Sequence, residues 1–317
     1  MSKLIANILY TILYVISLLP LKILYIISGF FAFMLRDVFH YRKKTVKENL
    51  SICFPNMDKK EMDNVIREFY IYLCDVFVEA VWQISASDKE LCQVVRRENQ
   101  QVMDDFCKRH NKVVMMMGHF GNWELVSGIC GENDTRSSDN FANFGIMLGY
   151  KKIRNKIADN LFCRMRMNLY KKFKTEGGIV ESHKILRHIL KDRNARNVYV
   201  FIADQSPHDG ARVVTQFLGR PTLMMPGPEY IATKLDVPVI YMGMKRVKRG
   251  EYMIKYTIIS EHSSSEPEYF ITREYARLLE EDIKGCKYNW LWSHKRWKKQ
   301  FTPQEKEEYA KLVRNLE

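Results

Sequence analysis

The stretch MMMGHFGNWELVSG, residues 115–128, decides how the chain folds around its most reactive side chains. The apolar run Val113–Met117 predicts a short buried strand ending at Gly118, and Leu125–Ile129 predicts the start of a helix. Side chains five positions apart on one helix point about 140° away from each other. His119 and Glu124 can therefore meet only if the residues between them form a turn. This is the geometry of a site at the carboxyl end of a strand in an α/β sheet.

Strand-like and helical patterns alternate along the rest of the chain. Apolar runs typical of strands fall at Val113–Met117, Val198–Ala203, Pro238–Met244 and Tyr252–Ile259. Helical spacing falls at Asp58–Gln83, Lys89–Arg109, Leu125–Cys130, Ile153–Phe173, Glu181–Lys191, Pro228–Leu235, Thr272–Ile283 and Thr302–Leu316. The last two strands are joined across Lys248-Arg-Gly250, which indicates an antiparallel hairpin. The pattern predicts the α/β class, with a mostly parallel mixed sheet covered on both faces.

Charge and cysteine content narrow the range of partners. The 317 residues carry 50 Lys and Arg against 37 Asp and Glu, a formal net charge of +13. This excess suits a polyanionic partner: nucleic acid, anionic lipid or an acidic carrier protein. The seven cysteines are scattered without a CxxC pair, which argues against a disulfide framework and structural zinc and fits a reducing compartment.

The amino-terminal stretch favours lipid over nucleic acid. From Leu4 to Leu35 the only formal charge is Lys22, and Pro20 divides the stretch into two apolar pieces. Each piece is shorter than the roughly 20 residues that cross a bilayer. One tilted, kinked helix or a helical pair in the interface both fit, and a buried core hairpin is the alternative. Basic residues follow directly, at Arg36, Arg42, Lys43, Lys44 and Lys47, which predicts a cytoplasmic location for the rest of the chain.

His119 and Glu124 suit proton transfer. An imidazole takes and returns a proton near neutral pH, and a carboxylate on its other nitrogen fixes the tautomer. The motif contains no Ser or Cys nucleophile and the chain lacks GxSxG, so the attacking hydroxyl is expected from the substrate, as in attack on an acyl thioester. Backbone N–H groups at the helix start, with Asn122, would stabilise the oxyanion. A pair that only caps the helix is the alternative, and the absence of HEXXH disfavours a metal site.

Four blocks of the sequence resemble the late acyltransferases of lipid A biosynthesis, the lauroyl/myristoyl family. His119–Glu124 resembles their HX4(D/E) motif, and Tyr41–Leu50 with Phe54-Pro55 resembles the segment after their anchor. Ala203-Asp204-Gln205 with Phe217–Thr222, and Tyr288–Lys298, resemble two later blocks. The resemblance implies an αβα acyltransferase fold over residues 37–317 behind an anchor at residues 1–36. It implies acyl transfer from acyl carrier protein to a hydroxyl of a lipid A precursor at the cytoplasmic face of the bacterial inner membrane, without metal or cofactor.

The chain departs from the family at one place. The family typically has Tyr-Arg before Asn-Pro, whereas this chain reads Tyr150-Lys-Lys-Ile-Arg-Asn155. The family arginine is presumed to hold phosphate or the oxyanion, and lysine lacks its planar fork. Lys151, Lys152 and Arg154 are the candidates for that role, and Arg164 is a further candidate for contact with lipid phosphates or a carrier protein.

Two further groups have both a functional and an ordinary interpretation. Asp204 and Gln205 end a predicted strand at the same sheet edge as His119, where they would line the pocket, although simple turn chemistry also explains them. The aromatic and basic residues of the last block suit a bilayer interface. They are Trp290, Trp292, His294, Lys295, Arg296 and Trp297. Nucleic-acid stacking could use the same residues, but no nucleic-acid-binding motif accompanies them.

The sequence therefore predicts a membrane-bound O-acyltransferase with His119 as general base. Lysophospholipids, aminolipids and glycolipids remain alternative acceptors, and coenzyme A remains an alternative donor. A non-catalytic membrane protein that binds lipid or a carrier protein is the alternative of another class.

Overall fold

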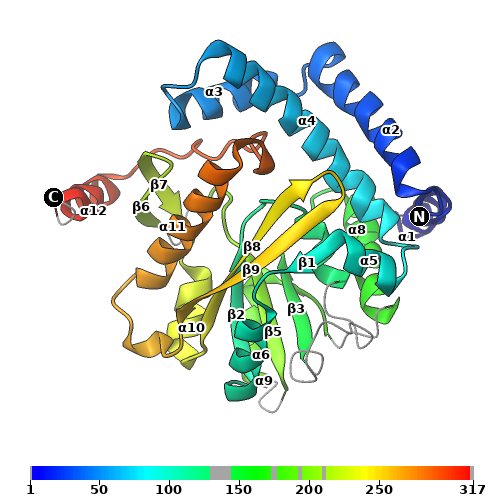
Figure 1. The fold of residues 1–317 in the computed structure, drawn as a ribbon. Coiled ribbons are helices and arrows are strands. Elements are labelled where there is room, and N and C mark those ends of the chain that lie inside the picture. The colour runs from blue at the N-terminus through cyan, green and yellow to red at the C-terminus, as the bar shows by residue number, and fades with distance from the viewer. Residues whose placement is uncertain (1, 129–143, 173–176, 192–194, 209–211, 315–317) are drawn as a thin grey trace.

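A seven-stranded sheet organises the chain in the computed structural model, which describes residues 2–128, 144–172, 177–191, 195–208 and 212–314 (Figure 1). The strand order is β1-β9-β8-β2-β5-β3-β4. All neighbouring strands pair in parallel except β8 and β9, which form the antiparallel hairpin that the sequence predicts. The strands are β1 Val95–Arg97, β2 Lys112–Met117, β3 Gly145–Tyr150, β4 Gly177–Glu181, β5 Asn197–Ile202, β8 Val239–Lys248 and β9 Glu251–Ser260. The mostly parallel α/β sheet is confirmed.

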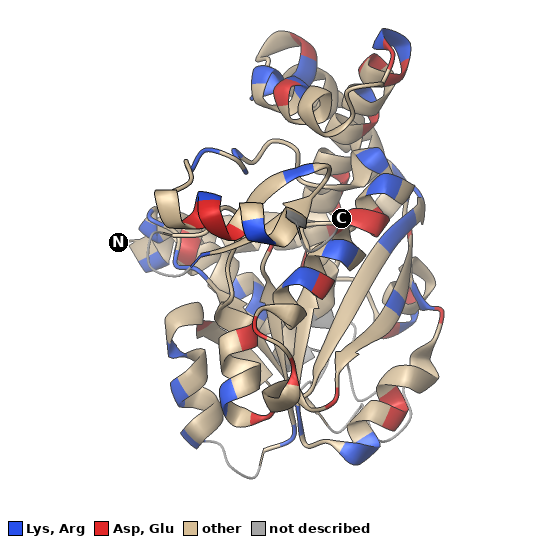
Figure 2. Ribbon diagram, turned by 90° about the vertical axis from the view of Figure 1, so that its left-hand side faces the viewer, with Lys and Arg blue, Asp and Glu red and all other residues tan. Residues whose placement is uncertain are grey.

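Helices surround this sheet, and a small antiparallel hairpin of β6 (Val213–Phe217) and β7 (Arg220–Met224) lies beside it. Helices α10 and α11 pack against β2, α6 packs against β9, and α8 packs against β4. The charged residues lie mainly on the helices and connections (Figure 2). The helices are α1 Ser2–Ser17, α2 Leu21–Phe33, α3 Lys43–Cys53, α4 Lys59–Trp82, α5 Asp88–Val94, α6 Gln100–Arg109, α8 Lys156–Lys172, α9 Ile185–Lys191, α10 Gly227–Leu235, α11 Phe270–Gly285 and α12 Pro303–Arg314.

Two predicted α-helices are wrong within the described residues. The stretch Lys89–Arg109 is not continuous, because Val95–Arg97 leaves the helical path and pairs in parallel with Tyr252–Ile254 of β9. The helix predicted from Leu125 is a 3₁₀ turn, Trp123–Gly128, within the described residues. The far ends of three predicted helices lie outside the described residues: 129–130, 173 and 315–316.

The apolar amino terminus forms two helices rather than one anchor helix. They are separated at Pro20, which has no N–H to donate to a continuous helix. Within the described residues no single helix combines the length and apolar character needed to cross a bilayer, whereas α1 and the stretch Leu21–Val38 meet that test as a pair bent by 117°.

Helix α2 is joined to α4 by a buried polar network. Asp75 of α4 is fully buried and accepts hydrogen bonds from Ser28 Oγ (2.5 Å), Arg246 and Arg249 Nη2 (2.7 Å). One helical turn further on, the equally buried Glu79 accepts from Tyr25 (2.7 Å), Tyr252 (2.6 Å) and Asn122 (2.6 Å). Burial raises the pKa of Glu79 although Arg246 and these three donors oppose it. The network therefore links the amino-terminal helices, α4 and the residues that follow β2.

Replacing Asp75 with Asn should destabilise the protein by about 3–5 kcal/mol, because the buried guanidinium of Arg246 then loses its paired charge. The matched control is Asp105→Asn, since the Asp105–Lys108 pair is exposed and contributes little. The free energy of unfolding, measured by urea denaturation in mild detergent, checks this expectation. Equal unfolding midpoints for the two variants would show that the network does not stabilise the fold.

Candidate active site

The register of the sheet brings His119 and Asp204 together. Met117 of β2 pairs with Ile202 of β5, so the second residue beyond each strand emerges at the same carboxyl edge. These two residues are His119 and Asp204, which are 85 positions apart in the sequence. The sheet therefore places a carboxylate beside the imidazole that no local motif contains.

Asp204 holds His119 by two contacts. Its Oδ1 lies 2.6 Å from the ring Nδ1, and its Oδ2 accepts the backbone N–H of His119 at 3.0 Å. The indole N–H of Trp290 donates to the same Oδ2 at 2.7 Å. Burial raises the pKa of Asp204, but the charge of His119 and the hydrogen bonds from its ring, its backbone N–H and Trp290 outweigh burial and lower the pKa to about 2. Asp204 is therefore ionised at neutral pH.

The second ring nitrogen of His119, Nε2, faces away from Asp204. A carboxylate only accepts hydrogen bonds, so in the neutral form of the imidazole Asp204 holds the proton on Nδ1 and leaves the lone pair on Nε2. The Gln205 amide nitrogen lies 3.2 Å from Nε2, at donor distance from that lone pair. The Trp123 ring packs edge-on against the imidazole, with 5.0 Å between the ring centroids. The side chain of His119 is 15 % exposed, which leaves it open to a bound substrate.

Glu124 does not make the expected contact with the imidazole. Its carboxylate instead pairs with Arg166 of α8, with the closest oxygen 2.8 Å from Nη2. Burial lowers the pKa of Arg166, but the pairing with Glu124 outweighs burial and raises it. The sequence interpretation failed because it paired the histidine with the nearest acid in the chain, whereas the parallel sheet brought a distant one.

Asn122 also lies differently from the expectation. Its side chain is fully buried, donates to Glu79 and accepts the Glu124 N–H at 3.1 Å, so it is committed to holding the turn. The expected role of Asn122 as a donor to an oxyanion does not fit these contacts. The Gly121 N–H is likewise used within the fold and donates to the carbonyl of Asn289 at 3.0 Å.

The turn after β2 requires glycine at position 121. Gly121 has a φ of +64°, and a Cβ at this position would lie 1.9 Å from the carbonyl oxygen of Met244. The Tyr72 hydroxyl donates to the Gly121 carbonyl at 2.7 Å and fixes the turn from the side of α4. The backbone therefore passes close to β8 here and directs the imidazole of His119 toward Asp204.

Gly121→Ala should destabilise the protein by more than the roughly 1–3 kcal/mol expected for the strained φ alone. Gly219→Ala is the matched control, because Gly219 has a φ of +72° but a Cβ added there would meet no atom within 4 Å. Thermal unfolding of both variants measures the difference, which isolates the clash with Met244. Equal losses would show that the turn relaxes away from β8 without cost.

Among the described residues none of the basic candidates from the sequence contacts the His119 ring. Lys151, Lys152 and Arg154 are exposed on the segment between β3 and α8, which leaves β3 at the same carboxyl edge of the sheet as His119. Arg164 of α8 contacts Asn7 and stacks over the Tyr10 ring, 4.6 Å from its centroid, so it joins α8 to α1. Within the described residues the imidazole of His119 is therefore contacted by Asp204 and Gln205 and by none of these four cations.

The aromatic and basic residues of the carboxyl-terminal block were expected at a bilayer interface, and the structure corrects this expectation. Trp290, Trp292 and Arg296 are at most 2 % exposed, so they cannot lie at a bilayer surface. Trp290 instead packs behind the site and donates to Asp204. The sequence feature that points to this contact with Asp204 is the indole N–H of Trp290, because a buried indole N–H needs a hydrogen-bond acceptor.

No group of three His, Cys, Asp or Glu side chains suited to a metal ion occurs in the described part of the chain. The contact between His119 and Asp204 suits proton transfer between Nε2 of His119 and a bound hydroxyl, with Asp204 stabilising the imidazolium.

Comparison with known proteins supports the resemblance seen in the sequence. A search of curated proteins found no match. The sequence profile of one family, described as "Bacterial lipid A biosynthesis acyltransferase", matches residues 2–299, which include both amino-terminal helices, the His119 turn and the carboxyl-terminal block. Because this match covers most of the chain, the protein belongs to the bacterial lipid A biosynthesis acyltransferase family.

Proposed function

We propose that the protein is a membrane-associated O-acyltransferase that moves a fatty acyl chain from an acyl carrier protein thioester to a hydroxyl of a lipid A precursor. The observation that carries this proposal is the contact of 2.6 Å between His119 and Asp204 at the carboxyl edge of the sheet. Membership of the family supports acyl transfer in lipid A biosynthesis as the reaction. The imidazole held by Asp204 is suited to act as the base that such a transfer needs.

The reaction follows from the position of the free ring nitrogen. His119 Nε2 takes the proton of the acceptor hydroxyl as the hydroxyl oxygen attacks the thioester carbonyl carbon. The carbon–sulfur bond then breaks, the acyl chain remains on the acceptor as an ester, and the imidazolium returns its proton to the thiolate. Asp204 stabilises the imidazolium between these steps. The amide nitrogen of Gln205 lies 3.2 Å from Nε2, so it would neighbour a hydroxyl bound at that nitrogen.

Glu124 has a supporting role in this proposal. Its pair with Arg166 ties the turn after β2 to α8, and its backbone carbonyl accepts from Gln83 Nε2 at 3.0 Å. Glu124 thus holds the backbone that carries His119 from two sides, while Asp204 acts on the ring itself.

The amino-terminal helices support a location at the cytoplasmic face of the bacterial inner membrane. Their outer faces carry large apolar side chains, such as Leu4, Ile26 and Phe30, which are 64 %, 74 % and 60 % exposed. Apolar surface of this extent is stabilised by contact with lipid acyl chains, and the bend of 117° favours a pair lying in the interface.

The proposal is tested by acyl transfer in purified membranes that contain the full chain, with His119→Ala as the blank. Labelled acyl groups are offered on acyl carrier protein and on coenzyme A, with lipid A precursors, lysophospholipids, aminolipids and glycolipids as acceptors. Label transferred from carrier protein to a lipid A precursor supports the whole proposal. Transfer only to another acceptor, or only from coenzyme A, replaces that substrate and keeps the mechanism. Inactivity with every pair would instead favour a lipid- or carrier-binding protein without catalysis.

A further inference from the structure

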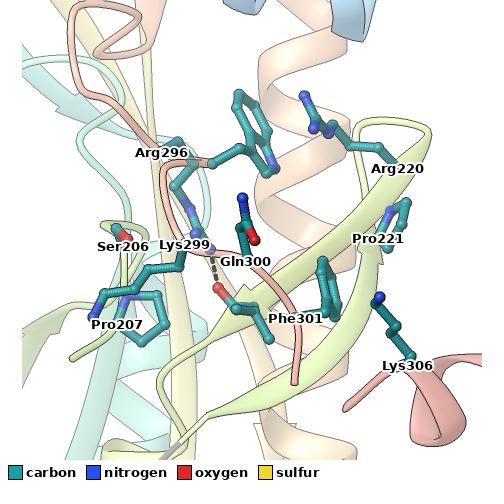
Figure 3. A pocket seen from close by; sticks show the side chains of 11 residues that line it. Ser206, Pro207, Arg220, Pro221, Arg296, Lys299, Gln300, Phe301 and Lys306 are labelled. Atoms are coloured by element: carbon teal, nitrogen blue, oxygen red, sulfur yellow. Dashed lines mark hydrogen bonds between the residues drawn. The ribbon is translucent and has the colours of Figure 1, made fainter. Parts of the chain in front are cut away.

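A basic pocket of about 320 Å³ lies next to the segment that follows Gln205. Figure 3 shows the side chains that line it. It begins at Ser206, the residue after Gln205, and is closed by Arg220 of the β6–β7 hairpin. The carboxyl-terminal segment supplies Arg296 and Trp297. Three segments therefore build the pocket. One of them begins directly after Gln205, whose side chain contacts His119 Nε2.

Within the part of the chain that the structure describes, the two arginines of this pocket form no ion pair with a carboxylate. Arg296 is 2 % exposed, and its Nη2 donates to the Leu223 carbonyl (2.6 Å) and to Met224 Sδ (2.7 Å). The guanidinium of Arg220 stacks on the Trp297 ring, 4.6 Å from its centroid. Arg220 is partly buried, whereas the lack of an ion pair among the described residues is costly for the buried guanidinium of Arg296.

Three polar atoms of the lining residues are buried in the protein beside the pocket. Arg296 Nε, Arg220 Nη1 and Ser206 Oγ have no hydrogen-bond partner among the described residues. Burial lowers the pKa of Arg296 to about 10, with Asp204 opposing and Arg220 adding to this effect. Among the described residues that line the cavity, four are basic and none is acidic, and this positive lining favours an oxyanion as the occupant. The four are Arg220, Arg296, Lys299 and Lys306.

We propose that this pocket binds a phosphate group of one of the two substrates, and this inference rests on the proposed acyl transfer. A phosphate offers several acceptor oxygens and negative charge, which match guanidinium forks and a serine hydroxyl. Phe301 and the Trp297 ring supply apolar wall for the group that carries the phosphate. Two sources share this chemistry: the sugar phosphate of the acceptor and the phosphodiester of the donor's phosphopantetheine arm.

Direct binding to the full chain tests the pocket without turnover. Calorimetric titration with glucosamine 1-phosphate and with phosphopantetheine compares wild type, Arg220→Gln and the matched control Arg277→Gln, which removes an exposed guanidinium of α11. Loss of a charge-assisted contact should weaken one of the two ligands about 10- to 100-fold in Arg220→Gln, and the control should match wild type. The ligand that is weakened identifies the source of the phosphate.

Steady-state kinetics provides the second readout. The substrate that carries the bound phosphate should show a KM raised by about 10-fold or more in Arg220→Gln, with kcat nearly unchanged. Lys306→Gln, at an exposed pocket residue of α12, should shift the same KM in the same direction, and it keeps the test valid if Arg220→Gln unfolds. Equal binding and equal KM values in wild type and both variants would contradict the proposal that this pocket binds a substrate phosphate. Binding of phosphate without acyl transfer by wild type would overturn the proposed function and leave the pocket standing.

Discussion

His119→Ala is expected to lower kcat for acyl transfer by about 10²- to 10⁴-fold. This is the loss that follows removal of a positioned general base, because water then has to take the proton of the acceptor hydroxyl. KM for either substrate should change little, since Nε2 acts on the reacting proton rather than on the bulk of a ligand. Initial rates in membranes with saturating donor and acceptor give the measurement.

The control for this variant is His183→Ala. His183 is 72 % exposed next to Glu181, so its removal should leave the rate unchanged. Residual activity within a few-fold of wild type in His119→Ala would place the base elsewhere and would remove the main support for the mechanism.

Asp204→Asn is expected to lower kcat for acyl transfer by a similar factor, about 10²- to 10⁴-fold, while the protein remains folded. The amide keeps the shape of the carboxylate but removes its charge, so the imidazolium is no longer stabilised and the Nδ1–H tautomer is no longer imposed. Glu124→Gln should cost much less, because that carboxylate pairs with Arg166 rather than with the ring. The comparison of the two variants is the measurement that decides which acid serves His119.

A larger loss in Glu124→Gln than in Asp204→Asn would contradict this assignment. Stability against pH gives an independent check, since the pKa of Asp204 is lowered to about 2. A lowered acidic pKa contributes stability above the pKa of the unfolded chain, and this contribution is lost as the pH falls toward 2. The difference in stability between wild type and Asp204→Asn should therefore shrink below about pH 4.

The sequence predicted the strands that are long and uniformly apolar. Val113–Met117 is fully buried, and such runs are typical of a parallel sheet covered by helices. The strands β1, β3 and β4 were missed because they are short or rich in glycine, such as Gly145, Gly149 and Gly177, which weaken the apolar signal. They belong to the sheet through pairing with distant strands.

The same distinction between local and distant information explains the candidate site. His119 and its turn were predicted from one short stretch, because the histidine directly follows a strand. The partner of the histidine depends on the register between β2 and β5, which no local pattern encodes. Trp290 and Arg296 were placed at a membrane surface because their composition suits one, whereas their burial is decided by packing across the whole chain.

The network around Asp75 and Glu79 has a practical consequence for preparing the protein in solution. Deletion of residues 1–36 would be the usual way to remove the apolar helices, but it would also remove Ser28 and Tyr25 from two buried carboxylates. Glu79 also accepts from Asn122, so the damage would extend to the turn that carries His119. Polar replacements at outward-facing positions such as Leu4 and Ile26 would improve solubility and leave these contacts intact.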